Sequence, residues 1–135
     1  MPTWNPALVT GHPTIDEQHQ ELFARSDSLL EAMLQGRAAD ETAELVVFLG
    51  DYCRNHFAME ERLMAESSYP VTGLHRHAHR DFEHRFQEIE KTVTERGATA
   101  YVILQVKDLI RGWLVAHILT ADAKLAEFLR AARAA

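Results

Sequence analysis

Four stretches of this chain place bulky side chains at every third or fourth position, which is the spacing of a buried helical face. They cover residues 15–35, 40–67, 74–96 and 99–130. The third stretch is the most regular, with inward positions at His75, His79, Phe82, Phe86, Ile89 and Val93. Amphipathic helices joined by short connections pack as antiparallel neighbours. The sequence therefore predicts an all-α fold, an antiparallel up-down-up-down four-helix bundle.

The segment before the first stretch has a different character. It contains three prolines within its first fourteen residues, which predicts an extended N-terminal arm over 1–14. We expect Trp4 to pack this arm on the bundle through its indole ring. Thr14 followed by Glu17 has the spacing of a capping box, which predicts that the first helix begins there. With 135 residues and no linker or repeat, the range 1–135 is expected to form a single domain.

Composition argues against several classes of partner. The formal charge is -6 and no run of lysine or arginine offsets it, which disfavours nucleic-acid binding. The N-terminus lacks a basic segment followed by an apolar run, and no apolar run is long enough to cross a bilayer. The single cysteine, Cys53, cannot form an internal disulfide and is expected to be a small buried side chain. We therefore expect a cytoplasmic monomer with no nucleic-acid and no membrane partner.

Six polar side chains occupy inward positions on the four stripes. They are His19, His56, Glu60, His75, His79 and His117. A buried polar group without a partner costs about 1–3 kcal/mol, and a metal centre offsets that cost because it uses imidazole lone pairs and carboxylate charge together. In an antiparallel bundle these positions fall at one level, so we predict one metal-binding layer. By contrast, His77 and His84 are expected to be exposed, and His12 to be structural.

The motifs that carry these residues resemble those of the hemerythrins, in particular the single-domain bacterial kind. They are IDEQHQELF at 15–23, HFAMEE at 56–61, HRHAHRDF at 75–82 and WLVAHILTAD at 113–122. The resemblance implies a non-haem di-iron site in which His75, His79 and His117 bind one iron. His19 and His56 would bind the other. Glu60 and Asp122 would bridge the two iron ions (Fe²⁺/Fe³⁺) together with an oxo or hydroxo group.

Asp122 enters this set through the resemblance and not through helical periodicity. Five residues after His117, it lies about 140° around an ideal helix, so it would reach the metals only by a long approach or a local change of pitch. Without the motif, Asp122 would be interpreted as an exposed aspartate. One departure from the family pattern is Leu125, where many relatives carry a tyrosine, and this change removes an expected hydrogen bond near the site.

The resemblance implies reversible dioxygen binding for oxygen transport, storage or sensing, with the open position on the iron of His19 and His56. We expect an apolar pocket around that position, formed by Leu22, Phe57, Trp113, Leu114 and Ile118. Five neutral imidazoles and only two carboxylates favour reversible binding over oxygen activation. The chain also lacks the Glu-x-x-His spacing of carboxylate-rich di-iron oxidases. We therefore expect an oxygen-binding protein and not an enzyme.

Two alternatives remain open. The same centre could belong to an enzyme that reduces nitric oxide or peroxide, and sustained turnover with a reductant would distinguish it from a carrier. A sensor or adaptor is a second alternative, which the lack of an attached signalling domain disfavours. The identity of the metal rests on the resemblance alone, because sites with nitrogen and oxygen ligands generally bind copper or zinc more tightly than ferrous iron.

Overall fold

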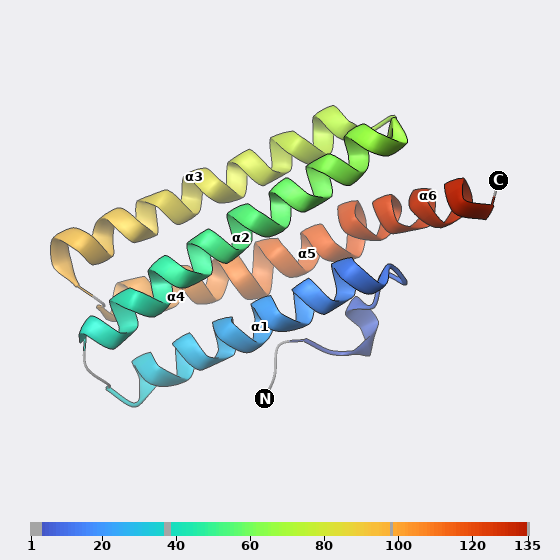
Figure 1. Cartoon of the computed structure of the whole chain (residues 1–135). Coiled ribbons are helices and arrows are strands. Elements are labelled where there is room, and N and C mark those ends of the chain that lie inside the picture. The colour runs from blue at the N-terminus through green and yellow to red at the C-terminus, as the bar shows by residue number, and fades with distance from the viewer. Residues whose placement is uncertain (1–3, 37–38, 98, 135) are drawn as a thin grey trace.

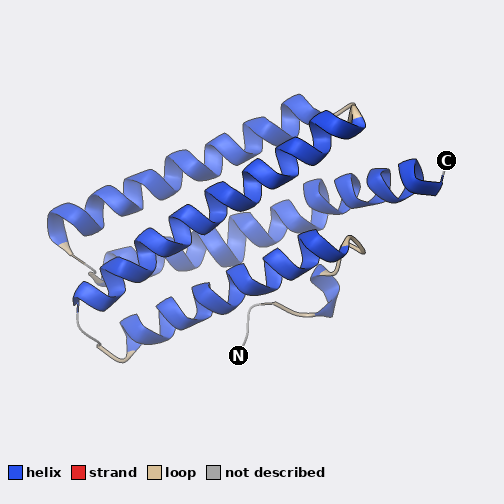
Figure 2. Cartoon of the chain, in the orientation of Figure 1, coloured by secondary structure: helices blue, strands red, loops and turns tan. Residues whose placement is uncertain are grey.

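A computed structural model describes residues 4–36, 39–97 and 99–134. They form a bundle of four long helical segments, here called rods (Figures 1 and 2). The first three rods are α1 (Pro13–Leu34), α2 (Ala39–Ser67) and α3 (Thr72–Arg96). The fourth is continuous but irregular: α4 (Ala100–Lys107), η2 (Asp108–Leu114), α5 (Val115–His117), η3 (Ile118–Asp122) and α6 (Ala123–Ala134). Successive rods run in opposite directions and no strand occurs among the described residues. This confirms the predicted all-α antiparallel bundle.

The start of α1 differs from the capping-box prediction. The helix begins at Pro13, not at Thr14, and proline suits this position because its missing N–H would have no intrahelical partner there. The Nδ1 atom of His12 accepts a hydrogen bond from the backbone N–H of Ile15 at 3.3 Å. The prediction that Thr14 caps the helix was therefore wrong, and the side chain of His12 takes that role.

The fourth rod changes pitch in two places. The segments Asp108–Leu114 and Ile118–Asp122 are π-helical. In the second, the backbone N–H of Ala123 donates to the carbonyl of Ile118, five residues earlier. Such wide turns amount to one residue inserted into an α-helix and are frequent at functional sites. The second one directly follows His117, and it determines where Asp122 points.

The bundle core consists of two hydrophobic clusters with a polar layer between them. The smaller cluster contains Ile15, Met64, Tyr69, Leu125 and Leu129. The larger one fills the rest of the bundle and includes Leu22, Phe57, Phe82 and Ile118. On α1, His19 lies between Ile15 of the smaller cluster and Leu22 of the larger one. On α2, Glu60 lies between Phe57 and Met64, and on the fourth rod Asp122 lies between Ile118 and Leu125. The predicted polar layer therefore lies between the two clusters.

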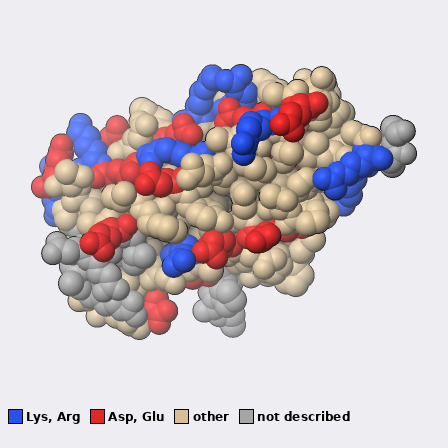
Figure 3. Space-filling model, in the orientation of Figure 1, with Lys and Arg blue, Asp and Glu red and all other residues tan. Residues whose placement is uncertain are grey.

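The N-terminal arm folds back along the bundle (Figure 1). It contains a short 3₁₀ turn, η1 (Pro6–Leu8), and its Leu8 is 2% exposed. Trp4 is partly buried and packs against the larger cluster, as expected. Acidic and basic side chains are interspersed over the face in Figure 3. Among the described residues, no helix has an apolar stretch long enough to cross a membrane.

Candidate metal centre

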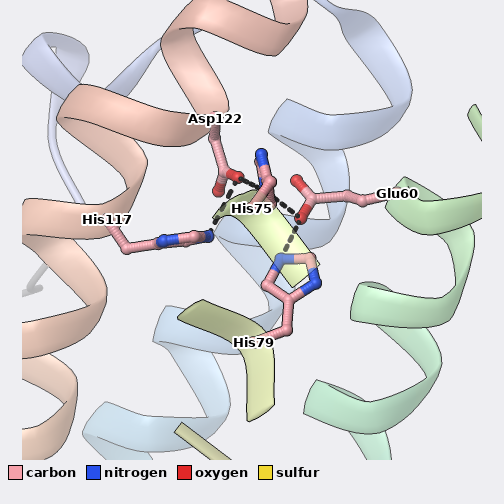
Figure 4. Close-up of side chains that lie close together, drawn as sticks. All are labelled: Glu60, His75, His79, His117 and Asp122. Carbon is pink, nitrogen blue, oxygen red and sulfur yellow. Dashed lines mark ion pairs between the residues drawn. The ribbon is translucent and has the colours of Figure 1, made fainter. Parts of the chain in front are cut away.

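Seven polar side chains from all four rods meet in the layer between the two clusters, and each is at most 6% exposed. They are His19, His56, Glu60, His75, His79, His117 and Asp122. Figure 4 shows five of them, with Glu60 projecting from α2, His75 and His79 from α3, and His117 and Asp122 from the fourth rod. The structure therefore brings together every residue that the sequence placed in the site.

The carboxylate of Glu60 lies between two groups of imidazoles. Its Oε1 atom is 3.0 Å from Nε2 of His79 and 3.5 Å from Nε2 of His75. Its Oε2 atom is 3.5 Å from Nε2 of His56. The two oxygens of one carboxylate thus face different imidazoles, which is the geometry that a bridging carboxylate needs.

Asp122 divides its oxygens in the same way. Its Oδ1 atom is 3.0 Å from Nε2 of His75 and 3.3 Å from Nε2 of His117. Its Oδ2 atom is 3.0 Å from Nε2 of His19. Together with Glu60, this arrangement defines two overlapping subsites that share both carboxylates. The triad subsite adds His75, His79 and His117, and the pair subsite adds His19 and His56.

These contacts are not hydrogen bonds. Although the atoms lie 3.0–3.5 Å apart, the Nε2 atoms of the five histidines and all four carboxylate oxygens have no hydrogen-bond partner among the described residues. In each subsite the candidate ligand atoms all lie within 4.8 Å of one another. In an octahedron with bonds of about 2.1 Å, neighbouring ligand atoms lie about 3.0 Å apart. The spacing of the donors therefore fits two metal ions.

The protonation preferences of His56 and His79 suit metal ligation. Burial lowers the pKa of His56 to about 3 and the pKa of His79 to about 2, because a buried imidazolium loses its hydration. Neighbouring histidines lower both values further. Both side chains are therefore neutral at physiological pH, the form in which an imidazole offers a lone pair to a metal.

The pKa values of His75, Glu60 and Asp122 depend on one another. Burial lowers the pKa of His75, but the carboxylates of Asp122 and Glu60 outweigh it and raise that pKa to about 9. Burial raises the pKa of Glu60, and the charge of Asp122 raises it further. Burial also opposes ionisation of Asp122, but His117, His19 and His75 hold its pKa below the usual range. Two ionised carboxylates at this depth need positive charge beside them, which protons or metal cations can supply.

The π-helical turn explains how Asp122 reaches the site. In an α-helix, the fifth residue after His117 would point well away from it. The wider turn over Ile118–Asp122 brings that residue back to the same side. Of the two routes considered from sequence, a long approach or a local change of pitch, the structure has the second. Asp122 is 0% exposed, so it is not the exposed aspartate that periodicity alone suggests.

Two residues that contact the histidine rings were not predicted from the sequence. The Oε1 atom of Gln18 lies 2.6 Å from Nδ1 of His56. The Oε2 atom of Glu61 lies 3.2 Å from Nδ1 of His79. A partner at Nδ1 fixes the ring and leaves Nε2 free for a metal. Glu61 directly follows the inward Glu60, and this pair of adjacent glutamates could have indicated a second carboxylate near the site.

Aromatic rings cover two of the imidazoles. Phe57 stacks on His79, with ring centroids 4.0 Å apart and planes 12° from parallel. Trp113 stacks on His117 at 4.8 Å and 14°, as expected for the residue one turn earlier. The other residues of the predicted apolar pocket are buried in the larger cluster: Leu22, Leu114 and Ile118. The layer is thus enclosed by apolar side chains on the side of the larger cluster.

The remaining histidines and the cysteine behave as predicted. His77 and His84 are exposed on α3. Cys53 is 1% exposed, and burial raises the pKa of its thiol. Protonated and enclosed, that thiol is a packing group and not a nucleophile at neutral pH.

Comparison with known proteins agrees with the geometry. The hemerythrin HHE cation binding domain family matches residues 10–129. Bacteriohemerythrin of Pseudomonas aeruginosa (strain UCBPP-PA14) is 32% identical over 127 residues, covering 94% of this chain and 80% of the relative. Hemerythrin of Themiste dyscrita is 31% identical and myohemerythrin of Theromyzon tessulatum 27% identical, each over 121 residues, 90% of this chain and 88% of the relative. With its bundle, its seven-residue polar layer and this match over nearly the full chain, the protein belongs to the hemerythrin family.

Proposed function

We propose that this chain binds dioxygen reversibly at a di-iron centre, as an oxygen carrier, store or sensor and not as an enzyme. The observation that carries the proposal is the division of the carboxylate oxygens. One oxygen of Glu60 and one of Asp122 face the triad subsite, while the other oxygen of each faces the pair subsite. Iron bound in these subsites would supply the electrons that dioxygen binding requires.

The two subsites do not offer the same number of donors. His75, His79 and His117 with one oxygen from each carboxylate give five donors, and His19 and His56 with the other two oxygens give four. A shared solvent oxygen between the ions would raise these numbers to six and five. An octahedral ion in the pair subsite would then keep one open position, as a metal that binds a substrate must. We assign dioxygen to that position.

The surroundings of the site favour binding over turnover. Leu22, Phe57 and Ile118 are at most 1% exposed, so water and protons are kept away from the open position. With only two carboxylates among seven ligands, the site also donates less negative charge than carboxylate-rich oxidases do. The rival is an enzyme that reduces nitric oxide or peroxide. It would need a continuous supply of protons and electrons.

The test combines metal analysis with spectroscopy. We expect two iron ions per chain, and an absorption band that appears when oxygen is added to the reduced protein and disappears when oxygen is removed. Sustained consumption of nitric oxide or peroxide with a reductant would support the enzyme instead. One zinc ion and no colour would end the proposal.

A pair of matched variants tests the ligands. His79→Asn removes one donor of the triad subsite, whereas His77→Asn changes an exposed histidine two residues away. We expect His79→Asn to lower the iron content below two per chain and His77→Asn to leave it at two. Equal iron content in the two variants would remove His79 from the ligand set.

A cytoplasmic location and a monomeric state complete the proposal. The buried, unpaired Cys53 is compatible with a reducing compartment. Cell fractionation and sedimentation of the iron-loaded protein test these two points. A dimer at micromolar concentration would contradict the second.

A further inference from the structure

A small pocket lies beside the metal layer, between the turn that joins α2 to α3 and the fourth rod. Its volume is about 180 Å³. Its polar lining comes from Tyr69 in the turn, His75 in α3, and Thr120 and Lys124 in the fourth rod. The described residues that line the pocket include no aspartate or glutamate. The pocket thus has room for a ligand of a few atoms, and its lining combines apolar surface from Val71, Leu74 and Ala121 with polar groups that include Tyr69, His75 and Lys124.

The strongest indication of a ligand is the unused nitrogen of His75. Its Nε2 atom faces Asp122 and Glu60, so Nδ1 lies on the opposite edge of the ring. His75 is 3% exposed, and Nδ1 has no hydrogen-bond partner among the described residues. When Nε2 holds a metal, Nδ1 carries a proton and needs an acceptor. His56 and His79 have such an acceptor from side chains. Nδ1 of His19, like that of His75, has no partner among the described residues, but only His75 of these two lines the pocket.

The adjoining end of α3 is electrostatically positive. The helix begins at Thr72 without a side-chain cap at Val71, and no acidic residue occupies its first turn. An uncapped helix N-terminus carries a partial positive charge and unpaired N–H groups. Lys124 adds a full positive charge on the other wall. A negative ligand would therefore be favoured here over a neutral one.

The metal centre would add to this preference. Two divalent cations bring four positive charges, of which Glu60 and Asp122 neutralise two and a bridging hydroxide would neutralise a third. The nearest negative group in the layer, Asp122, would then be engaged by the metals and would no longer repel an anion. Tyr69 is protonated, because burial and the charge of Asp122 raise the pKa of its phenol. Its hydroxyl is thus available as a further donor.

We propose that this pocket binds a small monovalent anion, a carboxylate or oxyanion of formate or nitrate size, which accepts the Nδ1 proton of His75 and pairs with Lys124. The inference rests on the proposed metal centre, because metal at Nε2 fixes the proton on Nδ1. A negative acceptor at Nδ1 increases the electron donation of an imidazole to its metal. Anion and metal therefore tighten each other's binding by the same factor.

The experiment uses zinc-loaded protein, which is diamagnetic, after metal analysis has established two ions per chain. Nitrogen-15 NMR follows the Nδ1–H group of His75 during titration with sodium formate, with formamide as the neutral analogue of the same shape. We expect a saturable downfield shift with a dissociation constant on the order of millimolar, and no such shift with formamide. A linear shift without saturation would overturn the proposal.

Two lysine variants locate the binding. Lys124→Gln should weaken formate binding at least tenfold, while Lys91→Gln, an exposed lysine far along α3, should leave it unchanged. Equal effects of the two variants would mean that formate responds only to the overall charge. Shifts of His19 and His56 that persist in Lys124→Gln would mean that formate binds the metal directly, which also overturns the proposal. Fewer than two zinc ions per chain would instead count against the metal centre itself.

Discussion

The carboxylate of Glu61 connects a metal-facing histidine to the protein surface. Its Oε2 atom lies 3.2 Å from Nδ1 of His79, and its Oε1 atom accepts a hydrogen bond from Nε of Arg76 at 3.0 Å. His56 faces the neutral amide oxygen of Gln18 instead. A carboxylate polarises an imidazole N–H more strongly than an amide does. The carboxylate of Glu61 therefore holds the Nδ1 proton of His79 more firmly than the amide of Gln18 holds that of His56.

Glu61→Gln should weaken metal binding, because an amide keeps the contact with His79 but removes the charge. We expect zinc affinity to fall by about tenfold, the lower end of the range for such supporting residues. Competition with a chromophoric chelator measures this affinity. The matched control is Glu66→Gln, which changes an exposed glutamate on the same helix. If both variants lose the same affinity, the effect comes from overall charge and not from His79.

The π-helical turn can be tested by changing its length. Deleting Leu119, which is 50% exposed, makes Asp122 the fourth residue after His117, and residues four apart share one face of an α-helix. We expect this deletion to retain two metal ions per chain. Inserting one alanine after Leu119 should turn Asp122 away by about 100° and reduce the metal content. Metal analysis checks both variants, and loss of metal from the deletion variant would contradict this explanation of the turn.

Phe57 should contribute to stability and to protection of the site. It is 0% exposed and stacks on His79. Phe57→Leu should lower the free energy of unfolding by about 1–2 kcal/mol and accelerate oxidation of the reduced iron centre, because water gains access to it. Phe48→Leu is the control, since Phe48 is 43% exposed and should cost less than about 0.5 kcal/mol. Urea denaturation and stopped-flow absorbance provide the two measurements.

His12 should make stability depend on pH. Its Nδ1 atom accepts the N–H of Ile15 only while the ring is neutral, and burial together with the charge of Arg133 lowers the pKa of His12. The unfolded chain, with the ordinary value of about 6.5, then binds this proton more readily than the folded one. The contribution of His12 is therefore fully present above pH 6.5 and is lost as the pH falls below it.

His12→Asn removes this titration while its side-chain oxygen can accept the same hydrogen bond. As the pH falls from 7.5 to 5.5, we expect the parent to lose up to about 1 kcal/mol more of its free energy of unfolding than the variant loses. His12→Ala should lose about 1 kcal/mol at pH 7.5 because the cap is absent. Urea denaturation of the metal-loaded proteins gives these values. Parallel pH curves for the parent and His12→Asn would show that His12 does not cap α1 as a neutral ring.

Much of the architecture could be predicted from the sequence. The periodicity of apolar side chains indicated four rods, and antiparallel packing of those rods put His19, His56 and His75 at one level. These predictions succeed because a helix fixes the direction of each side chain from its position alone. The start of α1 was less predictable, because a histidine ring replaces the usual serine or threonine as its cap.

Only the tertiary structure decided the directions of individual side-chain atoms, which helical periodicity does not specify. Asp122 joins the layer through a local change of pitch, and each oxygen of Glu60 and Asp122 is assigned to its own subsite by side-chain rotation within the packed bundle. The partners of the Nδ1 atoms, Glu61 for His79 and an open pocket for His75, depend on contacts between different elements. Sequence spacing determined which side chains enter the core, whereas packing determined which atoms of those side chains meet.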